Sequence, residues 1–77
     1  MEISVLAFGQ IADATGESNF KIHDVGDTDE LIRLLDKKFP KMKSMEYSIA
    51  VNKKIIKENC LLAGNDTVAL LPPFSGG

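Results

Sequence analysis

The sequence predicts a small α+β domain in which one main helix packs across a mixed sheet of about five strands. Short apolar stretches rich in β-branched residues recur along the chain, and one longer stretch repeats its apolar residues at helical spacing. The expected order is strand, strand, helix, strand, strand, strand, which suits a sheet with a helix on one face. A chain of 77 residues has room for one such domain.

The N-terminal part supplies two strands. Residues 3–8 are apolar almost throughout, which is typical of a central strand covered on both faces. Residues 10–14 suffice for one or two connecting helical turns. Residues 18–23 alternate, with Phe20 and Ile22 on one side, and so predict a half-exposed strand.

The main helix is expected to begin after Asp27, because Asp27 and Glu30 have the spacing of a capping box. Apolar residues then recur at helical spacing as far as Phe39, and Pro40 ends the helix. Two lysines in the last turn favour the negative end of the helix dipole. One apolar face of this helix should therefore lie on the sheet.

The C-terminal part supplies the other strands. Residues 47–51 and 55–56 flank a tight turn at residues 52–54, in which Asn52 tolerates positive φ. Residues 67–71 form a last apolar strand.

Leu61 and Leu62 are expected beneath the loop at residues 64–66. This order fits a ubiquitin-like domain at residues 1–71, although small ferredoxin-like pieces show similar spacing.

The tail at residues 72–77 reads Pro-Pro-Phe-Ser-Gly-Gly. Proline gives no N–H to a β-ladder, so the sheet should end there, and six extended residues span about 20 Å. Gly-Gly has no side chains and could enter a narrow tunnel. The alternative is a frayed chain end, against which the stiff Pro-Pro pair and the apolar Phe argue.

The carboxylate of Gly77 is the group expected to react. A carboxylate is ionised at neutral pH and is a poor electrophile, so it needs activation. Adenylation would provide a leaving group, but the sequence has no glycine-rich phosphate loop followed by lysine. A separate activating enzyme must therefore use the ATP.

Composition excludes several other classes. The net charge of −2 and the absence of a large basic block give no support to nucleic-acid binding. Cys60 is the only cysteine, so no internal disulfide can form, and a reducing cytoplasm is the expected location. We expect no signal peptide, no membrane span and no metal site.

Four stretches resemble the small subunits of molybdopterin synthase (MoaD), within the ubiquitin-like sulfur carriers. They are residues 5–10, 50–52, 65–69 and, above all, the ending Leu-Pro-Pro-Phe-Ser-Gly-Gly at residues 71–77. The resemblance implies a β-grasp fold and a non-catalytic, sulfur-donating subunit with no cofactor of its own.

The resemblance also implies a reaction and two partners. Gly77 would be adenylated by a ubiquitin-activating-like adenylyltransferase and converted to a thiocarboxylate. The tail would then enter the large catalytic subunit, where two sulfurs delivered by successive carriers convert cyclic pyranopterin monophosphate into the dithiolene of molybdopterin. The assembly implied is a heterotetramer, a dimer of carrier and catalytic pairs. The inserting residues would be Pro72, Pro73, Phe74, Ser75 and Gly76.

Phe8 and Leu71 correspond to the family's apolar partner surface; the alternative is that both are simply core. Two positions depart from the family pattern. Asn65 stands where the family usually has glycine, but Asn tolerates left-handed geometry. Phe74 replaces a smaller aliphatic residue and could alter the fit to the partner.

Other functions remain open. A carrier for thiamin thiazole or another thiolation route would also end in Gly-Gly, but typically without the preceding Pro-Pro. A ubiquitin-like modifier would be joined to lysines through Gly77. A plain interaction module with an inert tail is the last alternative.

Three further features each have two interpretations. Cys60 could serve in redox chemistry, although a lone cysteine is more often a small buried hydrophobe. His23 could act as an acid or base, although a surface strand histidine is the simpler account. The cluster of Lys53, Lys54 and Lys57 could meet an acidic partner or only solvate a turn.

Overall fold

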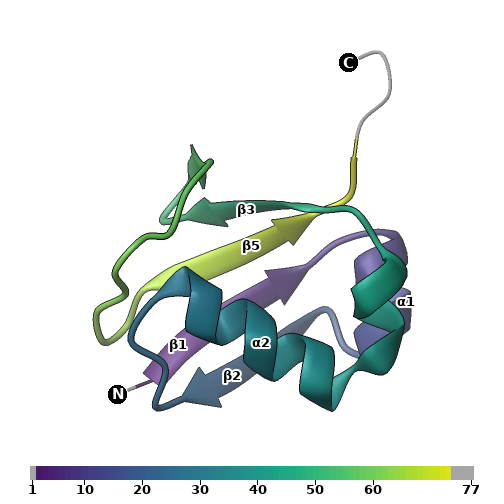
Figure 1. Ribbon diagram of the computed structural model, residues 1–77, viewed down its shortest axis with the longest axis horizontal. Helices are drawn as coiled ribbons and strands as arrows, with labels where there is room; N and C mark the ends of the chain where they lie inside the picture. The colour runs from purple at the N-terminus through teal and green to yellow at the C-terminus, as the bar shows by residue number, and fades with distance from the viewer. Residues whose placement is uncertain (1, 74–77) are drawn as a thin grey trace.

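The computed structural model describes residues 2–73, whose strands form one five-stranded sheet in the order β2-β1-β5-β3-β4 (Figure 1). The elements are β1 (Glu2–Ala7), α1 (Gln10–Thr15), β2 (Asn19–His23), α2 (Thr28–Lys38), the 3₁₀ helix η1 (Pro40–Ser44), β3 (Ser48–Val51), β4 (Lys54–Ile56) and β5 (Thr67–Leu71).

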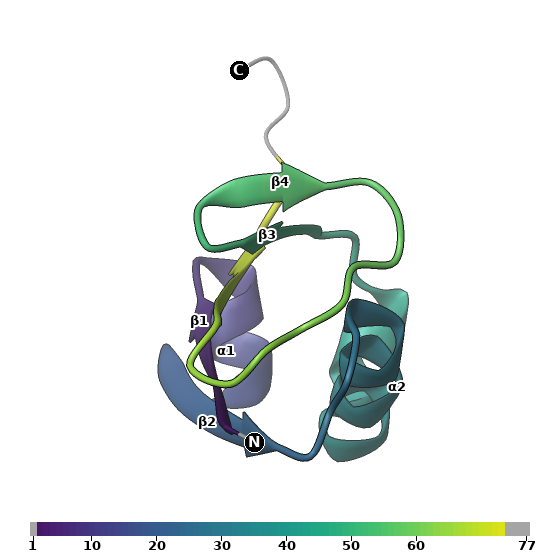
Figure 2. The same ribbon diagram turned by 90° about the vertical axis from the view of Figure 1, so that its left-hand side faces the viewer.

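The sheet is mixed. β1 and β5 run parallel at its centre, whereas β2, β3 and β4 pair antiparallel with their neighbours. Figure 2 shows α2 standing on one side of the sheet. A single main helix across a sheet whose first and last strands are parallel neighbours is the β-grasp arrangement, so the predicted fold is confirmed and the ferredoxin-like alternative is wrong.

The core lies between α2 and the facing side of the sheet. Because successive residues of a strand point to opposite faces, alternate residues of the two central strands share this side. Each fully buried aliphatic side chain contributes about 1.5–3 kcal/mol. The side chains with no exposed surface are Ile3 and Val5 of β1, Ile11 of α1, Leu31 and Leu35 of α2, and Val68 and Leu70 of β5.

The predicted start of α2 is confirmed. The Asp27 carboxylate accepts a hydrogen bond from the backbone N–H of Glu30 at 2.8 Å, and the Glu30 carboxylate accepts one from Gly26 N–H at 2.6 Å. The second bond reaches one residue further back than in a capping box. Pro40 ends α2 as expected, and it begins the short helix η1, which buries Met42.

Two expectations about burial are wrong. No described element covers the face of β1 opposite α2, so Leu6 is half-buried and the strand is enclosed on one face only. Leu62 is buried as expected, whereas Leu61 is 82% exposed. In both cases the apolar side chains are present but no other element packs over them.

The turn between β3 and β4 is tighter than expected. Asn52 and Lys53 have φ values of 50° and 73°, as in a two-residue turn in which both central residues are left-handed, and Lys54 pairs with Val51. Asn65 has φ 71°. The expected left-handed geometry of Asn52 and Asn65 is therefore confirmed.

Asn52 and Asp66 tie this turn to the start of β5. The Asn52 amide donates to the Asp66 carboxylate at 3.0 Å and accepts from Thr67 N–H at 2.9 Å, while Ala63 N–H donates to the same carboxylate at 2.8 Å. The bonds from Ala63 and then Asn52 favour the charged form of Asp66 and lower its pKa below 3.8.

We expect Asp66→Asn to change how stability depends on pH. A lowered pKa in the folded state means that the ionised carboxylate stabilises the fold above pH 3.8, and that this contribution is lost as pH falls through the lowered pKa. Urea unfolding followed by circular dichroism should show the wild type as more stable at pH 7, with the difference shrinking at acid pH. Glu46→Gln controls for the loss of one surface charge, and a difference for Asp66→Asn that stays constant with pH would contradict the assignment.

Candidate functional site

The root of the tail lies where β5 ends beside β1 (Figure 1). β5 ends at Leu71, Pro72 is half-buried and Pro73 is exposed, so the sheet stops at the prolines as predicted. The other predicted tail residues lie outside the described part of the chain; they are Phe74, Ser75, Gly76 and Gly77.

Gly9 fixes the position of this root. Phe8 N–H donates to the carbonyl of Leu70 at 3.3 Å, which holds the turn after β1 against the end of β5. Gly9 has φ 57° and ψ −129°, and a Cβ on it would lie 3.3 Å from Cγ of Pro72. Only glycine combines that backbone geometry with so close an approach. The sequence reasoning noted Gly9 within a family stretch but gave it no role.

The two predicted docking residues flank the root. Phe8 is 47% exposed, so the interpretation of Phe8 as core is wrong. Leu71 is half-buried. Ala7 pairs with Leu70, which makes Phe8 and Leu71 the next residues along two neighbouring strands. The structure therefore brings both predicted residues together beside Pro72.

An apolar row extends from this point across the face of the sheet opposite α2. Leu6 pairs with Ala69, Ala69 with Ala50, and Ala50 with Ile55, so the four side chains lie in register on four strands. We call Leu6, Ala50, Ile55 and Ala69 the open-face row.

Ile55 at the outer end of the row is 59% exposed. A depression of about 260 Å³ lies along the row and is lined by Leu6, Asn52, Lys53, Thr67 and Ala69. The sequence reasoning missed this surface, although the apolar residues on both faces of β1 and β5 were its signal.

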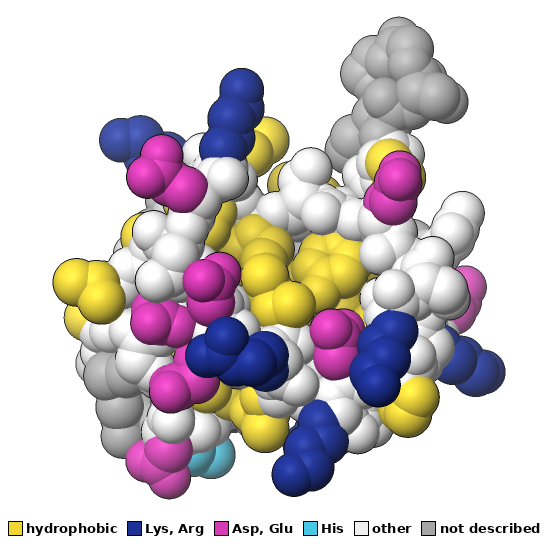
Figure 3. Space-filling model, viewed as in Figure 1, with side chains coloured by type: hydrophobic (Ala, Val, Ile, Leu, Met, Phe, Trp, Pro, Cys, Tyr) yellow, Lys and Arg dark blue, Asp and Glu magenta, His cyan; other side chains and the backbone are white. Residues whose placement is uncertain are grey.

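A second hollow of about 260 Å³ lies on the helix side, between α2 and the β3–β4 hairpin (Figure 3). Ile32, Ile49 and Ile56 line it together with Tyr47, whose pKa is raised by burial and by the nearby Asp36 carboxylate. A tyrosine with a raised pKa stays neutral at physiological pH. Polar side chains complete the lining, among them Asp29, Lys57 and Glu58, so the hollow is as polar as it is apolar.

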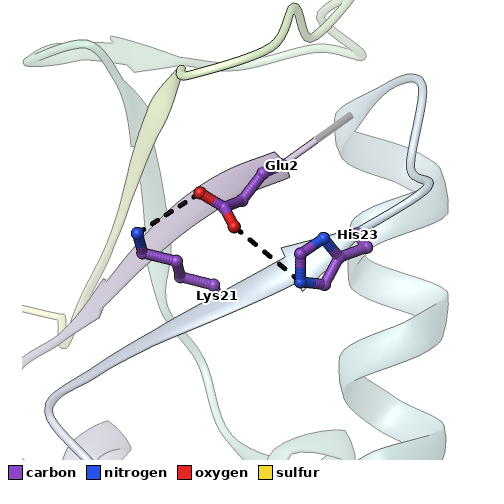
Figure 4. Close-up of polar contacts among 3 residues, drawn as sticks. All are labelled: Glu2, Lys21 and His23. Carbon is purple, nitrogen blue, oxygen red and sulfur yellow. Dashed lines mark hydrogen bonds and ion pairs between the residues drawn. The ribbon is translucent and has the colours of Figure 1, made fainter.

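The far end of the open face is polar. Glu2 lies 3.3 Å from the Lys21 ammonium and 4.0 Å from Nε2 of His23 (Figure 4). All three side chains are well exposed, and such pairs contribute at most about 1 kcal/mol. His23 is therefore a surface strand histidine, as the simpler interpretation expected.

The remaining candidates form no reactive group. Cys60 is half-buried, less enclosed than expected for a core hydrophobe, and its Sγ lies 3.5 Å from the carbonyl oxygen of Leu61. Among residues 2–73, no three His, Cys, Asp or Glu side chains are placed to hold a metal ion. Nor is any described helix long and apolar enough to cross a membrane. What the described residues offer is a binding surface and the root of the tail.

Comparison with known proteins agrees with this arrangement. The sequence profile of the ThiS family matches residues 5–77, which includes the open-face row and the whole tail.

Several solved structures are similar over almost the full chain. A chain from the complex of subunits 1 and 2 of molybdopterin-converting factor from Helicobacter pylori is 33% identical, with a TM-score of 0.76 and 100% of both chains covered. A protein assigned as molybdopterin converting factor subunit 1 from Pyrococcus furiosus has a TM-score of 0.89 at 21% identity, covering 96% of this chain and 99% of its own. Small archaeal modifier protein 1 from Haloferax volcanii has a TM-score of 0.82 at 20% identity, with 100% of both chains covered.

We expect Gly9→Ala to disturb the root of the tail. The added Cβ would lie against Pro72, and the native backbone of Gly9 has a positive φ that alanine rarely adopts. We expect the variant to lose about 1–3 kcal/mol in the free energy of unfolding. NMR spectra should show shifted signals for Leu71 and Pro72.

Gly16→Ala is the matched control, because Gly16 also has positive φ (81°) but nothing lies within 4 Å of its added Cβ. It should lower stability while leaving the signals of Leu71 and Pro72 in place. Equal shifts in both variants would show that the contact between Gly9 and Pro72 does not position the tail.

Proposed function

Because the chain belongs to the ThiS family, we propose that this ubiquitin-like protein is a sulfur carrier that bears its sulfur as a thiocarboxylate on Gly77. The observation that carries the proposal is the root of the tail. The last strand of the core ends at two prolines, of which Pro72 lies against Gly9, and the residues that follow Pro73 are Phe-Ser-Gly-Gly. The folded domain is thus followed directly by a short tail whose last two residues are glycines.

The chemistry proposed for Gly77 needs an enzyme that activates it. A carboxylate oxygen of Gly77 attacks the α-phosphorus of ATP, pyrophosphate leaves, and an acyl adenylate forms. Hydrosulfide then attacks the carbonyl carbon, AMP departs with the bridging oxygen, and loss of the S–H proton leaves a thiocarboxylate. The described residues offer no nucleophile with an adjacent base, so a ubiquitin-activating-like adenylyltransferase is proposed to bind the ATP and perform both steps.

The destination proposed for the sulfur is molybdopterin. Support comes from the 33% identity to a chain in a complex of the two molybdopterin-converting factor subunits, and from the Pro72–Pro73 pair before the Gly-Gly ending. In this proposal the tail enters a large catalytic subunit, and two carriers in succession each donate one sulfur to cyclic pyranopterin monophosphate to build the dithiolene. The assembly would be a cytoplasmic heterotetramer built from two carrier and catalytic pairs.

A second candidate is a ubiquitin-like modifier joined to lysines through Gly77. The similarity to small archaeal modifier protein 1, at 20% identity, extends to the fold alone. A carrier for thiamin thiazole is a further alternative within the same chemistry. The three candidate functions differ in the acceptor. A pterin or a thiazole precursor would accept the sulfur of a carrier, whereas a lysine would accept the acyl carbon of a modifier.

The open-face row, with Phe8 and Leu71, is proposed to dock the large subunit. An exposed aromatic side chain beside an apolar surface is a common anchor at protein interfaces. Phe8 makes such an anchor at the point where the tail leaves the domain. A partner seated there would receive the tail without any movement of the core.

Intact mass spectrometry tests the sulfur chemistry. Protein produced with its adenylyltransferase and a sulfur source should gain the mass difference between one sulfur and one oxygen, and deletion of Gly77 should abolish the gain. Branched peptides on lysines, with no sulfur on the free protein, would favour the modifier instead. Unchanged molybdenum-cofactor synthesis after deletion of Gly77 would overturn the proposal.

Phe8→Ser tests the docking surface. We expect binding to the large subunit to weaken about tenfold or more in isothermal titration calorimetry, because a buried aromatic anchor is lost. The fold should persist, since Phe8 is 47% exposed in the free protein. Leu61→Ser, which removes a side chain 82% exposed elsewhere on the surface, is the control and should bind as the wild type does. Equal weakening by both variants would contradict the assignment.

A further inference from the structure

Acidic side chains gather at the N-terminal end of α2 and lysines at its C-terminal end. Residues 24–30 carry four acidic side chains and no basic one, whereas residues 37–43 carry four lysines and no acidic side chain. The overall net charge of −2 conceals this separation. We call the four lysines the basic end; they are Lys37, Lys38, Lys41 and Lys43.

The basic end lies on the side of the domain from which the tail departs. η1 follows α2 directly, and β3 then begins at Ser48, which pairs with Leu71 at the end of β5. Figure 1 shows the C-terminal end of α2 and the end of β5 on the same side of the molecule. The acidic residues 24–30 lie at the opposite end of α2.

The four lysines are exposed and have no acidic partner within the described part of the chain. The ion pairs found among residues 2–73 join Glu2 to Lys21 and to His23. Lys38 instead lies over the ring of Phe39, with Nζ 5.8 Å from its centre. Figure 3 shows Lys or Arg side chains on this side of the molecule, together with Asp or Glu side chains nearer the point where the tail departs. These positive charges are therefore available to another molecule.

The fold explains only part of this cluster. Lys37 and Lys38 occupy the last turn of α2, where positive charge favours the helix dipole. Lys41 and Lys43 lie in the short helix η1, beyond the end of α2, and they add repulsion to the pair before them. The helix dipole of α2 therefore accounts for Lys37 and Lys38 but not for Lys41 and Lys43.

We propose that the basic end recognises an acidic protein surface surrounding the opening that takes the tail. The inference rests on the proposed function, since it assumes that a partner receives the tail. Because the two ends of α2 carry opposite charge, the field of an acidic partner would turn the tail side toward it before contact. Such steering raises the association rate far more than it prolongs the complex.

The test compares two double variants that each remove two lysines. Lys41→Gln with Lys43→Gln alters the basic end outside α2, whereas Lys54→Gln with Lys57→Gln removes the same charge from exposed positions in and after β4. Association and dissociation rates are measured by surface plasmon resonance against the large subunit and the adenylyltransferase of the same organism. The rates of each variant with each partner are measured at a series of salt concentrations.

The basic-end variant should associate with at least one partner about three- to tenfold more slowly at low salt. Its dissociation rate should be unchanged, and the difference should vanish near 1 M salt, where the screening length is about 3 Å. The Lys54 and Lys57 variant should associate at the wild-type rate. Lys41→Arg with Lys43→Arg should restore the rate, because it restores the charge.

Equal rates for the two glutamine variants, or no binding of the wild type to either partner, would overturn the proposal. The proposal would also be overturned if a short duplex RNA bound the wild type but not the basic-end variant, while both glutamine variants associated with the protein partners at equal rates. Intact mass separates this failure from that of the proposed function. A chain that accepts sulfur but shows no rate difference disproves only the role of the basic end, whereas a chain that accepts no sulfur disproves the carrier function.

Discussion

The parallel pairing of β1 with β5 is the constraint on which the rest of the molecule depends. Its register, from Ser4 opposite Thr67 to Ala7 opposite Leu70, joins the first and last strands of the chain at the centre of the sheet. It also brings Gly9 against Pro72, so the tail has a fixed root only once the last strand is in place. Pairing across so long a stretch of chain is entropically costly, and it commits almost the whole domain to one cooperative unit.

The same pairing leaves one face of the sheet without a partner. α2 covers the side of Ile3 and Val68, and the described residues provide no second layer over Leu6 and Ala69. Leu6 and Ala69 are partly exposed and Ala50 is buried, so the apolar surface of this face is exposed chiefly at Ile55 and Phe8. The docking area proposed for this face therefore adjoins the root of the tail at Pro72.

Local chemistry explains what the sequence predicted well. Asp27 caps α2, Asn52 and Asn65 adopt positive φ, and the prolines after Leu71 end β5, because each of these depends on the residue itself and its immediate neighbours. Exposure was harder to predict, because it depends on which distant element packs over a residue.

Leu6 and Leu61 are apolar and were expected to be buried, yet no described element packs fully over them. The role of Gly9 was missed for a related reason: its neighbour Pro72 comes from the opposite end of the sequence. The site could be anticipated as a tail, but its root required the sheet topology. Assignment of the sulfur and its destination depends on family membership, since no described side chain selects either.

The short distance between Pro73 and Gly77 limits how partners can share the protein. Four extended residues span about 13 Å, so an enzyme that acts on Gly77 must sit close to Phe8 and Pro72. An activating enzyme and a sulfur acceptor would then need overlapping parts of one surface, and a domain this small can serve only one of them at a time. If the proposed sulfur chemistry holds, the carboxylate and thiocarboxylate forms of Gly77 differ by a single atom, and that atom would have to determine which of the two partners can act.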